Sequence, residues 1–269
     1  MKALVNVVFL SACWAAVSLT GCTGLPSLPS ASVNRPDLVT DSDEPDQRRR
    51  ARLRVELATG YFEQGKTKIA LDEIKQSLAI DPSFVDAYNL RGLVYMRLND
   101  IALAEDSFRR ALNLNPNDAN VAHNYGWMLC QQTRYPEAMQ FFAQAVANPT
   151  YTGKARTLMA QGVCQISAGQ PSEAEQSLRR SYQLDAGNPV TAYNLASLLY
   201  QRGDLTRAQF YIRRVNNSEL ANAQTLWLGI KTERRLNNRE AVLQLAQQLK
   251  NRFSQSPEAA SYEKGSFNE

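Results

Sequence analysis

The sequence predicts an all-α solenoid of six two-helix repeats, twelve antiparallel helices in all, and three observations support this prediction. Residues 51–84 and 85–118 align at a period of 34 without a gap, which indicates a repeat architecture. Small residues and larger apolar residues recur at fixed places within the period, as close packing between helices requires. Pro82 and Pro116 occupy the same place in the two repeats, where proline ends the second helix.

The remaining repeats follow in order along the chain. Residues 119–152 continue the period, and residues 155–188 and 189–222 resume it after a slip of two residues. A degraded sixth copy covers about 223–255, so the repeat domain spans 46–256 and residues 257–269 form a C-terminal tail. Position 8 of the first five repeats holds a residue small enough to let the two helices approach closely: Ala58, Gly92, Gly126, Gly162 and Ala196.

The period and the recurring small residues resemble the tetratricopeptide repeat, with an unrelated helical bundle as the alternative. The resemblance implies a right-handed superhelix in which each repeat contacts only its neighbours. It also implies a concave face lined by the first helix of every repeat.

The N-terminal residues 1–21 predict an export signal. The apolar run Ala3–Leu19 is shorter than the roughly 20 residues that a membrane span needs. Leu-Thr-Gly-Cys at 19–22 resembles the lipobox of bacterial lipoproteins, which implies that Cys22 begins the mature chain and carries its acyl chains, palmitate among them. Leu-Ser-Ala-Cys at 10–13 also fits a lipobox, so lipidation of Cys13 is an alternative, and plain secretion is another.

The segment 22–45 predicts a flexible tether, because it is rich in Pro and Ser and has no apolar period. Thr23, rather than Asp, follows the lipobox cysteine, which in proteobacterial lipoproteins implies transfer to the outer membrane. We therefore expect a lipid-anchored protein of the outer membrane whose repeat domain faces the periplasm.

The concave side of the first helices carries apolar side chains where a purely structural helix would carry Lys, Glu and Gln. These residues predict a groove that binds a segment of a partner, with Trp127 and Tyr193 as anchors. The alternative is that they pack against one another across a tightly wound solenoid. The predicted groove residues stand at positions 5, 9 and 12 of the repeats: Val55, Phe62, Leu93, Met96, His123, Trp127, Met159, Val163, Ile166, Tyr193, Tyr200 and Trp227.

The convex side carries a recurring arginine pair. Positions 25 and 26 read Arg109-Arg110, Arg179-Arg180 and Arg213-Arg214 in three repeats. A solvated surface is one interpretation of this basic ridge, and contact with acidic lipid head groups or an acidic partner is the other.

Two cysteines remain once the signal and the lipidated residue are set aside. Cys130 and Cys164 lie on the first helices of adjacent repeats, whose axes are expected about 8–10 Å apart. We predict a disulfide between them, with two independent buried thiols as the alternative.

The residue inventory argues against catalysis. The chain has one histidine, no Cys-x-x-Cys, no Gly-rich phosphate loop and no Gly-x-Ser-x-Gly motif. We therefore expect no enzyme activity, no cofactor, no metal site and no small-molecule substrate. The net charge of +4 is too mild to suggest a nucleic-acid partner.

Three stretches narrow the resemblance further: "HNYGWMLCQQTRYPEA" at 123–138, "LWLGIK" at 226–231 and "QLKNRF" at 248–253. Together with the lipobox and the tether they resemble the type IV pilus biogenesis lipoproteins of the PilF/PilW type. This resemblance implies a pilotin, which binds the pilus secretin, the outer-membrane ring protein, and promotes its localisation and multimerisation. The alternatives are a general envelope scaffold lipoprotein that serves barrel assembly or cell-wall synthesis, and the regulatory subunit of an enzyme.

Overall fold

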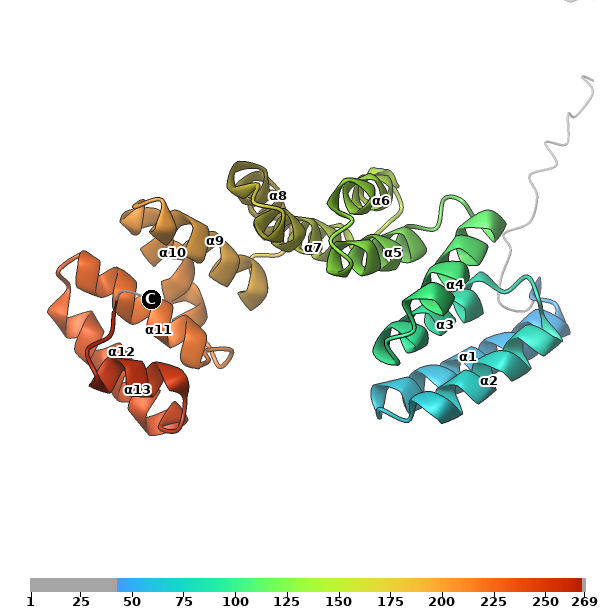
Figure 1. Cartoon of the computed structure of the whole chain (residues 1–269), viewed down its shortest axis with the longest axis horizontal. Coiled ribbons are helices and arrows are strands. Elements are labelled where there is room, and N and C mark those ends of the chain that lie inside the picture. Colours follow the sequence, from blue (N-terminus) through green and yellow to red (C-terminus); the bar gives the residue numbers. More distant parts are fainter. Residues whose placement is uncertain (1–42, 268–269) are drawn as a thin grey trace, which may run out of the picture. The chain divides into compact units, whose positions relative to one another are not determined.

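The computed structural model describes residues 43–267, and this part of the chain is a stack of α-helices (Figure 1). The predicted all-α fold class is confirmed. The lipidation prediction for Cys22, its alternative Cys13 and most of the tether lie outside the described residues. The helices of residues 43–267 are α1 (Asp46–Glu63), α2 (Thr67–Ile80), α3 (Val85–Arg97), α4 (Ile101–Leu114), α5 (Ala119–Gln131), α6 (Tyr135–Ala147), α7 (Lys154–Ser167), α8 (Pro171–Leu184), α9 (Pro189–Gln201), α10 (Leu205–Asn216), α11 (Ala223–Arg235), α12 (Arg239–Phe253) and α13 (Pro257–Glu263).

Helices α1 to α12 form six antiparallel pairs, each joined by a short turn (Figure 1). One residue in every turn has a positive φ, and these residues repeat with the predicted period, including the slip of two after the third repeat. They are Gly65, Asn99, Thr133, Gly169, Gly203 and Asn237. The degraded sixth copy is therefore a complete helical pair.

Close approach of paired helices depends on the small residues at position 8. A Cβ atom on Gly92 of α3 would lie 2.6 Å from the ring of Phe108 on α4, and one on Gly162 of α7 would lie 2.5 Å from Leu178 on α8. Phe108 and Leu178 are fully buried in the core between their helices. The glycines thus leave the space that the large side chains of the partner helix fill.

Polar and proline residues set the ends of several helices. Asp118 caps α5 by accepting hydrogen bonds from the backbone N–H groups of Asn120 and Val121. Helices α2 and α4 end two residues before Pro82 and Pro116, as the sequence predicts.

The first helices of the repeats contact one another in a continuous row. Each of α1, α3, α5, α7 and α9 touches the next odd-numbered helix, and α11 touches α13. We call the side of the stack formed by α1, α3, α5, α7, α9 and α11 the inner face.

The structure differs from the sequence analysis at the C-terminus. The segment taken there as a tail contains α13, which packs against α11 and α12. Ser256 caps this helix, Pro257 is its first residue, and the side chain of Ala259 within it is buried. Seven residues with a single buried position show too little periodicity for the sequence pattern to reveal.

Candidate functional site

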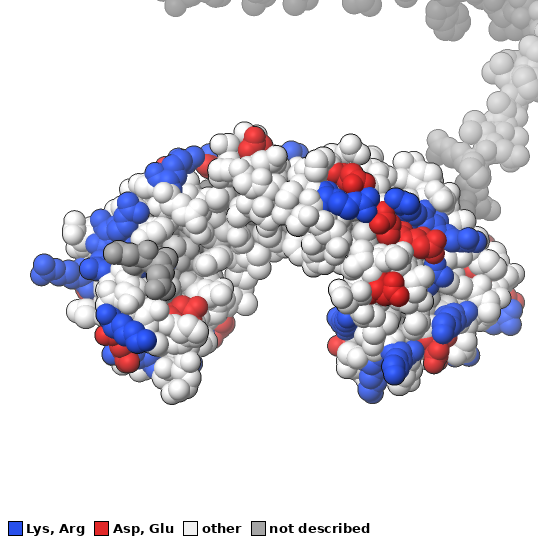
Figure 2. Space-filling model, viewed as in Figure 1, with Lys and Arg blue, Asp and Glu red and all other residues white. Residues whose placement is uncertain are grey.

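The inner face carries most of the apolar residues that the sequence assigns to a binding groove. Nine of the twelve are half-buried, with part of each side chain in contact with the core and part open to solvent. Figure 2 shows that the hollowed side of the central repeats is largely free of charged residues, which gather towards the two ends and the outer side of the stack. The nine half-buried residues are Phe62, Leu93, Met96, Trp127, Met159, Val163, Ile166, Tyr193 and Tyr200.

The prediction is wrong for three residues, whose side chains are buried: Val55, His123 and Trp227. Val55 packs in the core that α1 and α2 share with α3. Trp227 is 9% exposed because the ring of Phe267, beyond α13, stacks on it at a centroid distance of 5.3 Å. The periodicity of one helix predicts which way a side chain points. It does not predict that a segment 40 residues later in the chain covers that side chain.

His123 belongs to a buried polar network between α5 and α7. Its Nδ1 lies 2.9 Å from Oγ1 of Thr157, and the hydroxyl groups of Thr157 and Tyr151 are 3.0 Å apart. Burial lowers the pKa of His123 to about 4, with a further contribution from the positive charge of Arg156. The imidazole is therefore neutral near pH 7 and serves packing rather than partner contact. Tyr151 and Thr157 stand on either side of the two-residue slip, which is the sequence feature that marks this joint.

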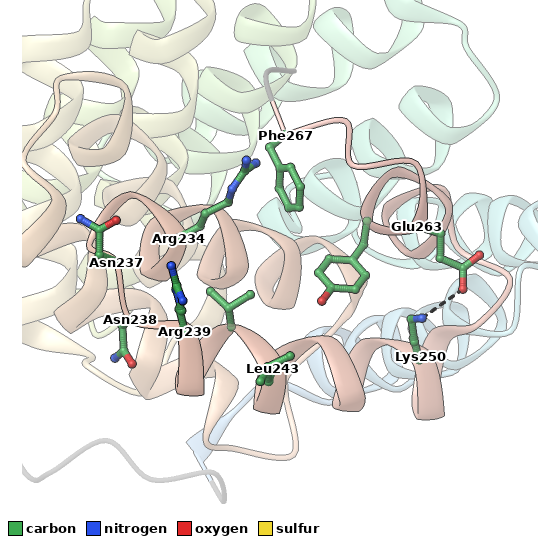
Figure 3. Close-up of a pocket in the computed structure, with 10 residues that line it drawn as sticks. Arg234, Asn237, Asn238, Arg239, Leu243, Lys250, Glu263 and Phe267 are labelled. Atoms are coloured by element: carbon green, nitrogen blue, oxygen red, sulfur yellow. Dashed lines mark ion pairs between the residues drawn. The ribbon is translucent and has the colours of Figure 1, made fainter.

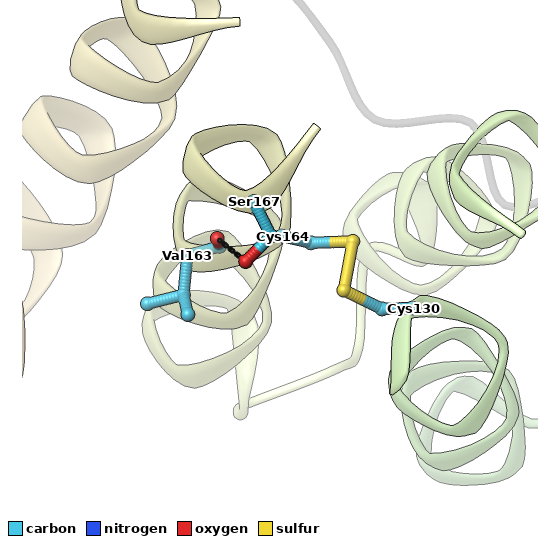
Figure 4. Close-up of a disulfide and its surroundings, with 4 residues drawn as sticks. All are labelled: Cys130, Val163, Cys164 and Ser167. Carbon is cyan, nitrogen blue, oxygen red and sulfur yellow. Dashed lines mark hydrogen bonds between the residues drawn. A yellow bond between two sulfur atoms is a disulfide. The ribbon is translucent and has the colours of Figure 1, made fainter. Parts of the chain in front are cut away.

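A disulfide joins α5 and α7 at the other end of the same joint (Figure 4). Cys130 and Cys164 have Cα atoms 5.8 Å apart, and this is the pairing predicted from the sequence. Both side chains are buried. The disulfide and the His123 network hold the inner-face helices of the third and fourth repeats together at two separate points.

Trp127 lies on α5 between His123 and Cys130, the two residues that link α5 to α7. It packs against the central core together with the half-buried residues Leu93 and Met96 of α3. Large aromatic side chains that are partly open to solvent often dominate the energy of protein–protein contacts. The inner face of α3, α5 and α7 is therefore the most suitable surface for a partner.

The arginine ridge on the outer side is partly neutralised by acidic residues. Arg109 pairs with Glu105 at 2.7 Å, and Arg213 pairs with the buried Glu233 at 2.6 Å. Burial favours the neutral form of Glu105, but hydrogen bonds from Arg134 and Tyr125 and the charges of Arg109 and Arg134 outweigh it and lower the pKa of Glu105. These pairs reduce the field that the ridge presents to an acidic surface.

Metal-binding clusters and membrane-spanning helices are both absent from the part of the chain that the structure describes. Within residues 43–267, no three His, Cys, Asp or Glu side chains gather closely enough to hold a metal ion. In the same part of the chain, no helix combines the length and hydropathy needed to cross a bilayer. The chemistry that this surface supports is apolar contact with another polypeptide.

Family models place the repeats among known proteins. Models described as the tetratricopeptide repeat match residues 85–118, 107–140 and 165–226, and one described as a TPR repeat matches residues 60–99. The match to 85–118 coincides with the second repeat predicted from the sequence.

Whole-chain comparisons identify a narrower group. The chain is 30% identical over 243 residues to the type IV pilus assembly protein PilF of Pseudomonas aeruginosa, an alignment that covers 90% of this chain and 92% of the relative. The solved structure of Pseudomonas aeruginosa PilF superposes with a TM-score of 0.75 at 27% identity, covering 82% of this chain and all of that one. The structure of PilW, described as a widely conserved type IV pilus biogenesis factor, gives a TM-score of 0.70 at 30% identity and covers 79% of this chain and 97% of its own. The chain therefore belongs to the family of tetratricopeptide-repeat proteins of type IV pilus biogenesis that includes PilF and PilW.

Proposed function

We propose that this chain is an outer-membrane lipoprotein of type IV pilus biogenesis that acts as a pilotin, binding the pilus secretin through its inner face. The observation that carries the proposal is the 30% identity to PilF across 90% of the chain. A role in type IV pilus biogenesis follows from the family. The secretin as partner and the outer membrane as location are the further steps of the proposal.

The surface of α3, α5 and α7 has the composition that such a partner requires. Leu93, Trp127 and Val163 stand at the same position of three successive repeats, and each is half-buried. Because α3 contacts α5 and α5 contacts α7, these side chains share one surface. An apolar surface of this kind binds an extended or helical segment of a partner and keeps it from aggregating before assembly.

The joint between α5 and α7 supports a preformed binding surface. The disulfide and the hydrogen bond between His123 and Thr157 fix the two helices relative to each other. Because the two helices are already fixed, less conformational freedom is lost when a partner binds. The affinity for the partner is higher for that reason.

The membrane anchor is the second part of the proposal. Acylation of Cys22 would hold the protein on the lipid surface, and the Pro- and Ser-rich tether would give the repeat domain reach. Mass spectrometry of the mature protein tests this step. Acyl chains on Cys22 support it, whereas acylation at Cys13 or an unmodified mature chain contradicts it.

A matched pair of substitutions tests the inner face. Leu93→Glu introduces a charge among the half-buried side chains of α3, whereas Leu103→Glu introduces it on α4, where Leu103 is 43% exposed and lies in the first turn of the helix. Both variants are checked for folding by circular dichroism. We expect Leu93→Glu to abolish capture of the secretin and its heat-stable multimers, and Leu103→Glu to retain both.

Two outcomes would contradict the proposal. Normal secretin multimers in cells that lack this protein would remove the pilotin role. Normal capture by a folded Leu93→Glu variant would remove the inner face of α3 from the interface. Photo-crosslinking from position 127 in intact cells identifies the bound protein directly, and a barrel-assembly or wall-synthesis protein captured there would replace the secretin as partner.

A further inference from the structure

The last repeat differs from the others because the chain's own C-terminal segment covers its inner face. Beyond α13, Gly265 adopts a φ of +69°, which turns the backbone and places Phe267 on Trp227. The two rings are stacked, with an interplanar angle of 27°. The guanidinium group of Arg234 lies 3.8 Å from the centre of the Phe267 ring (Figure 3). The ring of Phe267 therefore lies between a tryptophan and a cation.

Phe267 also lines two cavities. One, of about 560 Å³, lies between α9 and α11 and is lined by Tyr193, Tyr200 and Trp227. The other, of about 800 Å³, lies between α11, α12 and α13 and is lined by Leu243 and Tyr262 among others (Figure 3). Because Phe267 lines both cavities and stacks on Trp227, removing its ring would enlarge both cavities and uncover Trp227.

The walls of these cavities carry an excess of positive charge. Within residues 43–267, Arg234 and Arg239 form no ion pair, and Arg235 donates a hydrogen bond to the backbone carbonyl of Tyr200. Of the acidic side chains at the cavities, Glu263 pairs with Lys250 at 3.4 Å. The site therefore favours an aromatic side chain accompanied by a carboxylate.

The described end of the chain supplies the aromatic part of this chemistry. The ring of Phe267 contacts both Trp227 and Arg234, as the aromatic side chain of a partner would. We propose that the segment 264–267 is an internal substitute for a partner peptide, whose aromatic side chain replaces Phe267 on Trp227 and whose carboxylate binds Arg234. The inference extends the proposed function in that both use the inner face, but it does not require the partner to be the secretin.

A segment of the chain that already occupies this site raises the binding energy that a partner needs in order to bind there. A segment attached by a short link competes at an effective concentration in the millimolar range, so a short free peptide displaces it poorly. A partner that also contacts α3, α5 and α7 gains enough binding energy to displace it. The last repeat would then open only for a partner that already occupies the rest of the inner face.

The test uses the full mature chain and a fluorescent peptide with the sequence of residues 264–269, KGSFNE. Fluorescence anisotropy measures its binding to the wild-type protein, to Phe267→Ala and to Phe210→Ala, which alters an aromatic residue of α10 that is 60% exposed. We expect Phe267→Ala to bind the peptide at least about tenfold more tightly than the wild type and Phe210→Ala to match the wild type. Adding Arg234→Ala to Phe267→Ala should weaken binding again, and the peptide KGSANE should not bind.

A second variant guards against a folding defect in Phe267→Ala. Gly265→Ala keeps every side chain of the site and strains only the turn before Phe267, since no atom lies within 4 Å of the added Cβ. Its peptide affinity should lie between those of the wild type and Phe267→Ala. If neither variant binds the peptide more tightly than the wild type, Phe267 is a structural cap and the inference is wrong. Because the assay contains no secretin, its result is independent of the Leu93→Glu experiment.

Discussion

Gly92→Ala tests whether the small residues at position 8 determine how closely the helices of a repeat pack. Gly92 lies in α3 and faces the fully buried ring of Phe108 on α4. The added Cβ would lie 2.6 Å from two ring carbons and 2.8 Å from a third. A buried aromatic ring has no free space to move into, so the two helices must separate or the ring must leave its preferred rotamer.

The magnitude follows from two opposing contributions. Overpacking of a core costs about 1–3 kcal/mol. Replacing Gly by Ala within a helix contributes about 0.5–1 kcal/mol in the other direction. We therefore expect Gly92→Ala to lower the free energy of unfolding by about 1 kcal/mol, and by no more than about 2.5 kcal/mol, measured by urea titration followed by circular dichroism.

Gly60→Ala in α1 is the matched control. No atom lies within 4 Å of the Cβ that this substitution adds, so only the helix-propensity contribution remains. We expect this variant to gain about 0.5–1 kcal/mol. A Gly92→Ala variant at least as stable as the wild type, alongside a Gly60→Ala variant that behaves as expected, would refute the packing argument.

Three further predictions concern the third and fourth repeats. Thr133→Asn should raise the free energy of unfolding by about 1 kcal/mol in urea titrations, because Asn tolerates the φ of 59° better than a β-branched residue; a loss of stability would contradict this. Replacing both Cys130 and Cys164 by Ser should cost about 3–4 kcal/mol from the entropy of the 34-residue loop, and reduced wild-type protein should fall to the same stability; a variant as stable as the oxidised protein would contradict it. The pKa of His123 is about 4 in the folded protein, below its ordinary value of 6.5, so the unfolded chain binds the proton more tightly. The free energy of unfolding is therefore highest above pH 6.5. It falls by up to about 3 kcal/mol as the pH drops to 4. His123→Gln should remove this part of the pH dependence of the thermal midpoint, and an unchanged pH profile would count against the network.

The repeat architecture could be predicted from the sequence because it depends on local contacts. Each repeat buries its apolar residues against its own second helix and the next repeat, so the same requirement recurs every 34 residues. The pairing of Cys130 with Cys164 could be predicted for the same reason, since the two residues lie on first helices that must be neighbours. The match to PilF is likewise a property of the sequence.

The candidate site was only partly predictable because helix periodicity gives the direction of a side chain and not what covers it. His123 and Trp127 both point to the inner side of α5 by position, yet His123 is buried against Thr157 and Trp127 is half-buried. The difference arises from contacts across the joint, where His123 hydrogen-bonds Thr157 of α7 and Thr157 in turn contacts Tyr151.

The sequence by itself determined the number of repeats, their helices, the family and the residue types of the inner face, because periodic local packing leaves a periodic pattern. Only the tertiary structure decided which of those residues a partner can reach. The ring of Phe267 covers Trp227, although the two residues do not share a position in the repeat. Residues of α13, which packs against α11 and α12, help to line the two cavities beside Trp227. Accessibility depends on every segment that packs nearby, whereas a repeat pattern records only the packing that recurs.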